Sequence, residues 1–387
     1  MQYNFDKIIE RKGTNSLKYD YAKEMGKPDD VMPLWLADTD FQIPPAATEA
    51  IMKCAQHAIY GYTITKDDYN IAVQNWFARH FGFESKGEWI VKTPGVIFAL
   101  ATAVKAFAKE KESVMIQTPV YGPFYRLIED NNRKLVENPL IYKNGKFHID
   151  FEDFERKIKE NNVKVFILCS PHNPVTRVWT KDELHQMGEI CLRLGCLVVS
   201  DEIQCDFIYE GHTQHMFPTV HNTFMDNVVL CTAPTKTFNL AGLQNSNIFV
   251  PNERLRRLYA HEVSKTGYSS LNTMGLAAAK ASYEHGHEWL VELRKYLRGN
   301  LDFLKEFIAK KIPHVKVIEP EGTFMVWLDF TAFNMTHDEL DKLLLNKAKV
   351  WFSSGTLFGA GGAGFQRINI ACPRKTLEAG LERLLKL

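Results

Sequence analysis

The hydrophobic pattern from about residue 89 to residue 250 predicts strands and helices in alternation. Short apolar, often β-branched runs indicate buried strands at 89–92, 113–117, 163–169, 196–200 and 247–250 and from Val228 to before Pro234. Amphipathic patterns predict intervening helices at 96–107 and 181–193. Because the connections are short, this order predicts a mainly parallel sheet with helices on both faces, an α/β fold.

The rest of the chain shows a mixed, α+β pattern. Leucines at helical spacing predict a long helix from about residue 290 that ends before Pro313. Strands are expected at 323–329, 350–352 and 367–370, with a capping box at Thr336–Glu339 and a glycine-rich loop at 355–364. Residues 1–45 look like an arm with little regular structure. We therefore predict a large domain at 46–283 and a smaller one formed by 1–45 and 284–387.

Candidate chemistry gathers where the predicted strands end. Pro234 cannot continue a central strand, so Lys236 should lie in the loop after it. A lysine in such a place is ordinarily a solvated charge. Other strands, however, are followed by chemically useful residues, and carboxyl ends of parallel strands share one edge of a sheet. The residues concerned are Gly95, Tyr121, Asn173, Asp201 and Lys236.

Each of these residues has an ordinary interpretation and a functional one. The helix start after Gly95 could hold a phosphate or be a plain turn, and Tyr121 could stack on a flat ring or pack in the core. Prolines on both sides of Asn173 restrict the loop backbone, so the side-chain amide of Asn173 is held in a fixed direction. Asp201 ends a buried strand and needs a cationic partner, such as a ring nitrogen or an Arg.

Arg367 and Lys236 complete the pattern. The guanidinium of Arg367, after the glycine-rich loop, could clamp a carboxylate or form a rim salt bridge. A lysine with a lowered pKa can form a Schiff base with an aldehyde cofactor. Together, the six residues describe a site for pyridoxal 5'-phosphate that requires no metal.

Composition narrows the class of protein. The chain has 387 residues, of which 45% are hydrophobic, and its net charge is +1 from 47 basic and 46 acidic residues. This balance argues against a nucleic-acid or membrane partner and favours a small-molecule substrate. Seven cysteines without a CxxC pair fit neither a disulfide framework nor a zinc site. With no signal-peptide pattern at the N-terminus, we expect a cytoplasmic protein.

The sequence also resembles a known family. Matching stretches are LWLADTDF (34–41), YGYT (60–63), TPGV, TPVYGPF, CSPHNP with RVW, VSDEI, TAPTKTFNLAGL and GFQRIN (364–369). They are similar to pyridoxal-phosphate enzymes of the aspartate aminotransferase fold (fold type I), and within these to the MalY/PatB type of cystathionine β-lyase, or C-S lyase. The resemblance spans nearly the whole chain.

The resemblance implies a role for each matched residue. Lys236 would form the Schiff base with the cofactor, Asp201 would pair with the ring nitrogen, Asn173 would meet the ring hydroxyl and Tyr121 would stack on the ring. Arg367 would bind the substrate carboxylate. Tyr121 would also be catalytic, as Lys236 is. The remaining implied positions are backbone of Val96 and Ile97 for phosphate, Gln204 and Thr235 for the cofactor, Ala37 for substrate, and Tyr62 for the partner site of a homodimer.

Three positions depart from the family pattern. Gln204 stands where His is usual, and a Gln donates a hydrogen bond but cannot exchange a proton. Thr176 replaces a usual Gly, so its turn must avoid positive φ or accept strain. Thr235 replaces Ser and keeps the hydroxyl.

Three functions are compatible with these residues. The resemblance favours β-elimination of sulfur amino acids, such as L-cystathionine or cysteine S-conjugates, to thiol, pyruvate and ammonia. A pyridoxal-phosphate aminotransferase would use every residue named. A MalY-like regulatory protein with residual lyase activity is the third reading, against which the joint presence of Lys236, Asp201 and Arg367 argues.

Overall fold

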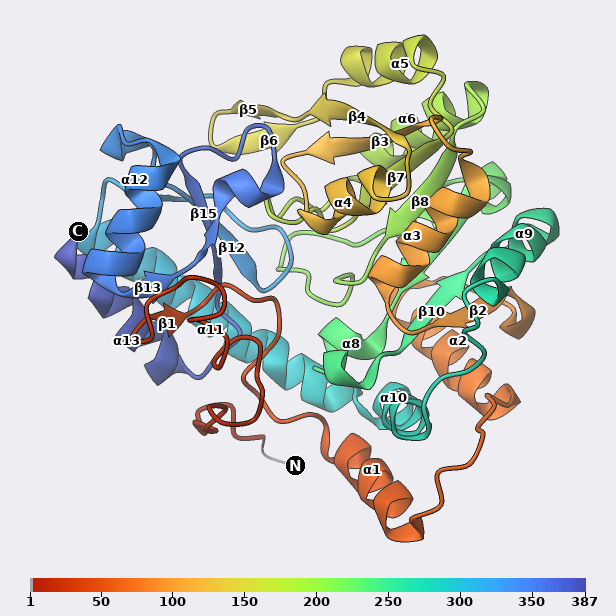
Figure 1. Cartoon of the computed structure of the whole chain (residues 1–387), viewed down its shortest axis with the longest axis horizontal. Helices are drawn as coiled ribbons and strands as arrows, with labels where there is room; N and C mark the ends of the chain where they lie inside the picture. The colour runs from red at the N-terminus through yellow and green to blue at the C-terminus, as the bar shows by residue number, and fades with distance from the viewer. Residues whose placement is uncertain (1–2) are drawn as a thin grey trace.

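The computed structural model describes residues 3–387 and contains two main sheets (Figure 1). The larger sheet has seven strands in the order β2-β10-β9-β8-β7-β3-β4. Their bounds are Ile90–Thr93 (β2), Ser246–Phe249 (β10), Val228–Thr232 (β9), Leu197–Asp201 (β8), Val165–Cys169 (β7), Ser113–Thr118 (β3) and Lys134–Pro139 (β4).

The prediction of a mainly parallel sheet is confirmed. Strands β9, β8, β7, β3 and β4 are parallel neighbours, whereas β10 is antiparallel to both β9 and β2. The sequence pattern gives no strand direction, so the reversal of β10 was not predicted. Strand β4 was missed as well, because this edge strand carries the charged residues Lys134 and Glu137 instead of a continuous apolar run.

Alternate residues of the central strands enter opposite cores. In β7, Val165 and Ile167 pack with helices α3 (Val96–Phe107), α4 (Pro123–Glu129) and α9 (Glu253–Ser264). Phe166 and Leu168 belong to the core on the other face, beneath α5 (Phe151–Glu160), α6 (Lys181–Arg193) and α10 (Thr273–His285). Both faces are therefore buried, which explains the unbroken apolar runs in these strands.

The smaller sheet has four strands in the order β11-β12-β15-β14. All of its pairs are antiparallel. Its strands are Lys316–Val317 (β11), Met325–Asp329 (β12), Phe365–Asn369 (β15) and Ser353–Ser354 (β14). The predicted capping box is present at Thr336, whose hydroxyl and backbone pair reciprocally with Glu339 at the start of α12 (His337–Lys342). The C-terminal helix is α13 (Arg374–Arg383).

One helix joins the two units. Helix α11 (His287–Lys311) is continuous through Gly299, and its residues Leu293 and Leu297 lie in the core under the large sheet. Further along, Leu301 and Leu304 lie in the separate core of the smaller sheet. Because one helix serves both cores, the predicted domain boundaries at 46 and 284 stay a prediction.

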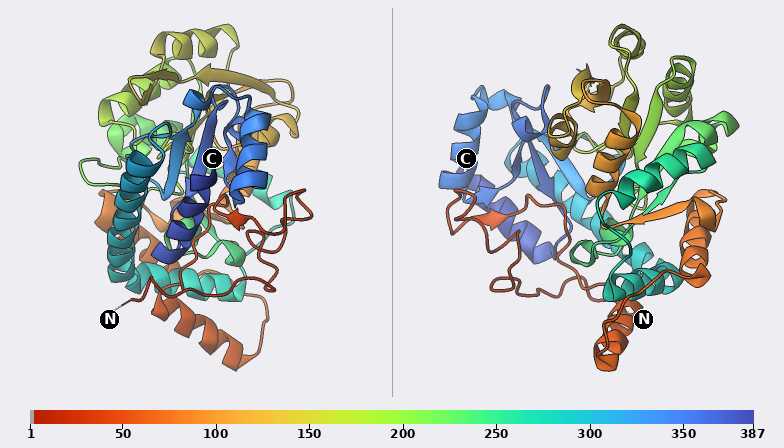
Figure 2. Two further views of the ribbon diagram at one scale, coloured as in Figure 1. Left: turned by 90° about the vertical axis from the view of Figure 1, so that its left-hand side faces the viewer. Right: turned by 45° about the vertical axis from the view of Figure 1, so that its right-hand side comes forward.

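The N-terminal arm packs against the smaller unit and then crosses to the larger one. A short strand of the arm, β1 (Met32–Pro33), pairs in parallel with β13 (Val350–Trp351). Figure 2 shows the arm (red) running along the C-terminal elements (blue). It ends at α1 (Pro45–His57), after which an extended segment leads to α2 (Asp67–Phe81). Within residues 3–387, each helix is too short or too polar to span a bilayer, and the cytoplasmic location stays a prediction.

Candidate active site

A cavity of about 160 Å³ lies at the carboxyl ends of the parallel strands. The residues that the strand-end argument gathered from distant parts of the chain meet here. The first turn of α3, Tyr121 after β3, Asn173 after β7 and Asp201 at the end of β8 all line it. The predicted site residues on its wall are Ala37, Val96, Ile97, Tyr121, Asn173, Asp201, Gln204, Thr235 and Lys236.

Lys236 lies on a one-turn helix, α8 (Pro234–Thr237), and not in the open loop that the sequence suggested. Strand β9 ends at Thr232, and Pro234 occupies the first helical turn, where its missing N–H leaves no hydrogen bond unmade. The amine of Lys236 donates a hydrogen bond to the carbonyl of Ala37 at 2.6 Å. Burial lowers the pKa of this amine, Arg367 lowers it further, and the charges of Asp38 and Asp201 oppose them. The lowered pKa favours the uncharged, nucleophilic amine.

Asp201 is a buried carboxyl with few partners. Burial raises its pKa to about 7, against the backbone N–H of Ile203 and the charge of Lys236, which lower it. The N–H of Ile203 donates to Oδ1 at 3.2 Å. Among the described residues, no cation lies within ion-pair distance of this carboxyl. A cationic group placed in the cavity would supply the missing charge.

Arg367 is buried beside the cavity and contacts Asn173. One guanidinium nitrogen donates to Asn173 Oδ1 at 2.9 Å, and the other donates to the carbonyl of Trp35 and the hydroxyl of Ser353. Nε is buried without a partner, and the guanidinium lies 4.7 Å from the centre of the Phe358 ring. Burial lowers the pKa of Arg367 to about 10. This uncompensated cation excludes the rim salt bridge and suits an anionic ligand.

Helix α3 brings backbone donors to the cavity. Gly95 precedes its first residue and offers no side chain as a cap, so the first N–H groups lack intrahelical partners. Val96 and Ile97 both line the cavity. Free N–H groups and the positive end of the helix dipole fit a phosphate at this position.

Tyr121, Gln204 and Thr235 also lie on the cavity wall. Tyr121 is half-buried, and burial raises its pKa. Gln204 is buried, and its Oε1 has no hydrogen-bond partner. Thr235 is buried directly before Lys236. Gln204 and Thr235, two of the three positions that depart from the family pattern, therefore lie at the site.

Thr176 adopts the strained backbone conformation that was one of the two alternatives expected for a Thr in place of Gly. Its φ is 62°, in the left-handed region that favours glycine. The carbonyl of Thr176 accepts hydrogen bonds from the N–H groups of Glu321 and Gly322, and its own N–H donates to His172. These bonds hold the turn that follows Asn173 in place.

Tyr62 does not reach the cavity of its own chain. Its side chain is fully exposed, in an extended segment where Ile59 and Ile64 are exposed as well. A surface hollow lined by residues 60–63 also touches Pro94, which lines the cavity. Tyr62 is thus placed outside the site, near its rim.

Sequence reasoning missed several residues that shape the site. Trp35, Ser353 and Phe358 surround Arg367, and Asn369 donates to the carbonyls of Leu36 and Asp38. Asn369 falls within a stretch already noted, but its partners are backbone carbonyls 333 and 331 residues away in sequence. Such acceptors leave no signal in side-chain patterns.

Comparison with known proteins agrees with this geometry. The profile of aminotransferase class I and II matches residues 29–384. The chain belongs to this family. Its fold is that of aspartate aminotransferase, with a mostly parallel central sheet.

Three relatives are similar over almost their full length. The cystathionine beta-lyase PatB of Bacillus subtilis is 41% identical over 98% of both chains. The structure of cystalysin from Treponema denticola, which contains pyridoxal 5'-phosphate, has a TM-score of 0.96 at 36% identity, covering 100% of this chain and 98% of that one. The pyridoxal-phosphate-bound C-S lyase of Staphylococcus hominis has a TM-score of 0.93 at 31% identity, with 100% and 98% covered.

Proposed function

We propose that the protein is a pyridoxal-phosphate-dependent carbon–sulfur lyase that acts by β-elimination on L-cystathionine or related cysteine S-conjugates. The products are a thiol, pyruvate and ammonia. The observation that carries the proposal is one cavity lined by Lys236, Asp201 and Asn173, with the buried guanidinium of Arg367 hydrogen-bonded to Asn173. The 41% identity to a cystathionine beta-lyase supports elimination as the reaction.

The residues present fit the cofactor. Asp201, which has no cationic partner within residues 3–387, would pair with a protonated ring nitrogen, while the free N–H groups of Val96 and Ile97 would hold the phosphate. Tyr121 would stack on the ring, Asn173 would meet the ring hydroxyl, and Gln204 and Thr235 would complete the binding wall. When bound, pyridoxal phosphate supplies an electron sink for negative charge that develops at the substrate Cα.

The amine of Lys236 would hold and move the proton. In the absence of substrate it would be the nucleophile toward an aldehyde, because burial lowers its pKa and favours the uncharged form. With an amino acid in the cavity, the amine of Lys236 would take the proton from the substrate Cα. Asp201, as a carboxylate, would keep the proton on the ring nitrogen.

Arg367 would fix the orientation of the substrate. Within residues 3–387 its buried guanidinium has no carboxylate partner, so a substrate carboxylate would supply one. Ala37 would form part of the same wall. Clamping the carboxylate beside Asn173 would hold the amino acid at the cavity that Lys236 also lines.

We further propose that the enzyme is a homodimer in which Tyr62 reaches the site of the partner subunit. Tyr62, Ile59 and Ile64 are exposed beside a hollow that touches the cavity rim through Pro94. Mixing inactive Lys236→Ala with a Tyr62→Ala variant should restore activity, because mixed dimers would contain one intact site. If the activity of the mixture equals only the sum of the activities of the two separate variants, the active sites are not shared between subunits.

The reaction is tested with L-cystathionine in the absence of a keto acid, with pyruvate and free thiol measured together. Equal and sustained release of both is expected. Lys236→Ala should abolish it, whereas Lys159→Ala, at an exposed surface lysine, should not. Absence of pyruvate, with amino transfer once a keto acid is added, would instead identify an aminotransferase.

A further inference from the structure

The segment Leu34–Phe41, called the strap here, crosses the seam between the smaller sheet and the turn that carries Lys236. Its backbone carbonyls accept hydrogen bonds from both sides. From the smaller sheet, Arg367 donates to Trp35, and Asn369 donates to Leu36 and Asp38. From the lysine turn, Lys236 donates to Ala37, and Asn239 donates to Thr39 and Phe41. The strap is therefore part of the frame that holds Lys236.

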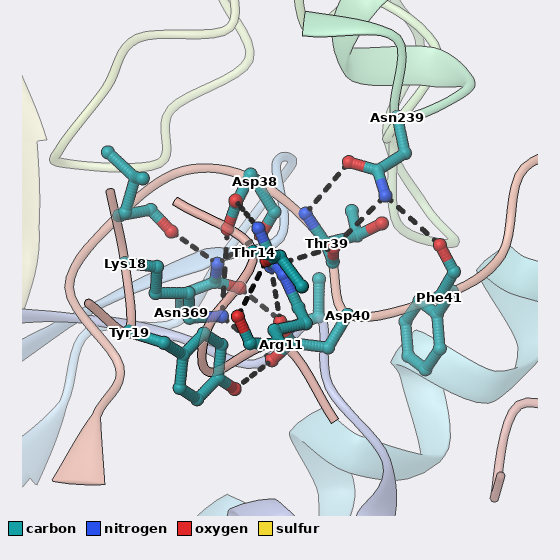
Figure 3. A network of polar contacts seen from close by, with 12 residues as sticks. Arg11, Thr14, Lys18, Tyr19, Asp38, Thr39, Asp40, Phe41, Asn239 and Asn369 are labelled. Carbon is teal, nitrogen blue, oxygen red and sulfur yellow. Dashed lines mark hydrogen bonds and ion pairs between the residues drawn. The ribbon is translucent and has the colours of Figure 1, made fainter. Parts of the chain in front are cut away.

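The two acidic side chains of the strap are held by an ion-pair cluster in the arm, called the clamp here (Figure 3). Arg11 bridges Asp38 and Asp40, with nitrogen–oxygen distances of 2.6 Å to each. Lys18 pairs with Asp40 at 2.8 Å and lies 3.7 Å from Asp38. The hydroxyl of Tyr19 donates to Asp40 at 2.9 Å.

Burial makes this cluster unlike an ordinary surface network. The side chain of Lys18 is fully buried, and that of Asp40 is 6% exposed. Arg11 is more open, at 24%. The two cations and two carboxylates balance, and removing one partner of a buried pair leaves an uncompensated charge. The clamp thus fixes both the shape of the strap and the net charge beside it.

The clamp is connected to Lys236 in two ways. Ala37, whose carbonyl accepts from the amine of Lys236, is the residue before Asp38. The charge of Asp38 also raises the pKa of that amine. The other charges that act on Lys236 are Arg367, from β15, and Asp201, from β8. Arg11 and Lys18 therefore act on the amine of Lys236 indirectly, through the carboxylate of Asp38.

We propose that Arg11 and Lys18 are positioning residues for the reaction: they fix the strap through Asp38 and Asp40, so that Ala37 orients the amine of Lys236 and the charge of Asp38 stays compensated. This inference rests on the proposed function, which assigns the cofactor to Lys236. Neither residue touches the cavity. Their effect is transmitted through the strap.

The proposal predicts opposite shifts for two single substitutions. Arg11→Gln removes a compensating cation, so the charge of Asp38 acts more strongly on Lys236 and favours the protonated state. Asp38→Asn removes the carboxylate itself and favours the unprotonated state. In the holoenzyme, the midpoint pH of the visible spectral change should rise in the first variant and fall in the second, each by about half a unit or more.

The matched control is Asp30→Asn. Asp30 also ties the arm to the smaller unit, through an ion pair with Lys349 at 3.0 Å, but it lies on the surface and outside the clamp. Its midpoint should match that of the wild type. Arg11→Lys retains the positive charge. Its midpoint pH should therefore lie much closer to the wild-type value than that of Arg11→Gln.

The kinetic readout separates positioning from loss of fold. Arg11→Gln should lower kcat at least about tenfold with a smaller change in KM, because the amine is misplaced while Arg367 still binds the substrate carboxylate. Shifts of the same sign in Arg11→Gln and Asp38→Asn, or midpoints equal to the wild type in both, would overturn the proposal. A wild-type protein that retains no visible absorption after incubation with pyridoxal phosphate and removal of the unbound cofactor would overturn the proposed function instead.

Discussion

Thr237, the residue directly after Lys236, donates a hydrogen bond to the buried carboxyl of Asp206, with Oγ1 and Oδ2 2.6 Å apart. The other oxygen of Asp206 accepts from Trp76 Nε1 at 3.2 Å. The turn that carries Lys236 is thus anchored to the core beneath it as well as to the strap above.

Thr237→Val should loosen this anchor while keeping the shape of the side chain. The free energy of unfolding should fall by about 1–3 kcal/mol, because one oxygen of a buried carboxyl loses its donor. We also expect kcat to fall several-fold as the lysine turn shifts. Denaturant unfolding and steady-state kinetics measure the two effects. Thr237→Ser retains the hydroxyl and should behave like the wild type; equal losses in both variants would contradict a role for the hydrogen bond.

Asp201→Asn should separate stability from catalysis. Burial raises the pKa of Asp201 from 3.8 to about 7. The folded state therefore holds this proton to higher pH than the unfolded state, and stability is lost as pH rises from about 4 to about 7. In the cofactor-free protein at about pH 8, Asp201→Asn should raise the free energy of unfolding by at most roughly 4 kcal/mol.

The same gain should vanish at about pH 3 or below, where wild-type Asp201 is largely protonated in both the folded and the unfolded state. Denaturant unfolding at the two pH values provides the comparison, with the exposed Asp302→Asn as control. Elimination activity of the cofactor-loaded variant should be lost, since an amide cannot keep a ring nitrogen protonated. A stability gain that is independent of pH would contradict the assignment of this titration to Asp201.

Arg367→Lys should impair substrate binding although it keeps the positive charge. A lysine cannot donate in parallel to Asn173, the Trp35 carbonyl and an incoming carboxylate. We expect kcat/KM for L-cystathionine to fall about 100-fold, or about 2.7 kcal/mol, mostly through KM. Bound cofactor, measured by its absorbance, should stay near one per chain. Loss of cofactor without a change in KM would place Arg367 in cofactor binding instead.

Thr176→Gly should stabilise the protein. Thr176 has a φ of 62°, which costs a non-glycine residue about 1–2 kcal/mol. Glycine removes that cost, and thermal unfolding should show a gain of about 1 kcal/mol after its greater chain entropy is subtracted. Thr176→Ala keeps the Cβ, and with it the strain, so it should give no gain. Equal stabilisation by Ala and Gly would show that the hydroxyl, and not the backbone, is responsible.

The large sheet and most of its cavity could be predicted because each clue was local. Val228 to Thr232 is an apolar run that Pro234 must terminate, and the rule that parallel strands share a carboxyl edge then brought Lys236 near Asp201 and Asn173. Local reasoning failed where position depends on distant backbone. Nothing in the sequence near Trp35 shows that its carbonyl accepts from Arg367.

The arm illustrates the same limit. Asp38 and Asp40 lie in the stretch LWLADTDF, but Arg11 and Lys18 lie twenty or more residues earlier in a segment without periodicity. Pairing such charges requires the path of the chain, which residue types do not encode locally. Tyr62 marks another limit, because its predicted role requires a second subunit.

The contact between the strap and Arg367 also sets an order of events during synthesis. Trp35 and Arg367 are 332 residues apart, so the arm leaves the ribosome long before the strand that completes its hydrogen bonds. The strand that pairs with β1, β13, is likewise made late. A nascent chain can therefore build the large sheet and its lysine turn first, while the finished active site must await almost the last residues of the polypeptide.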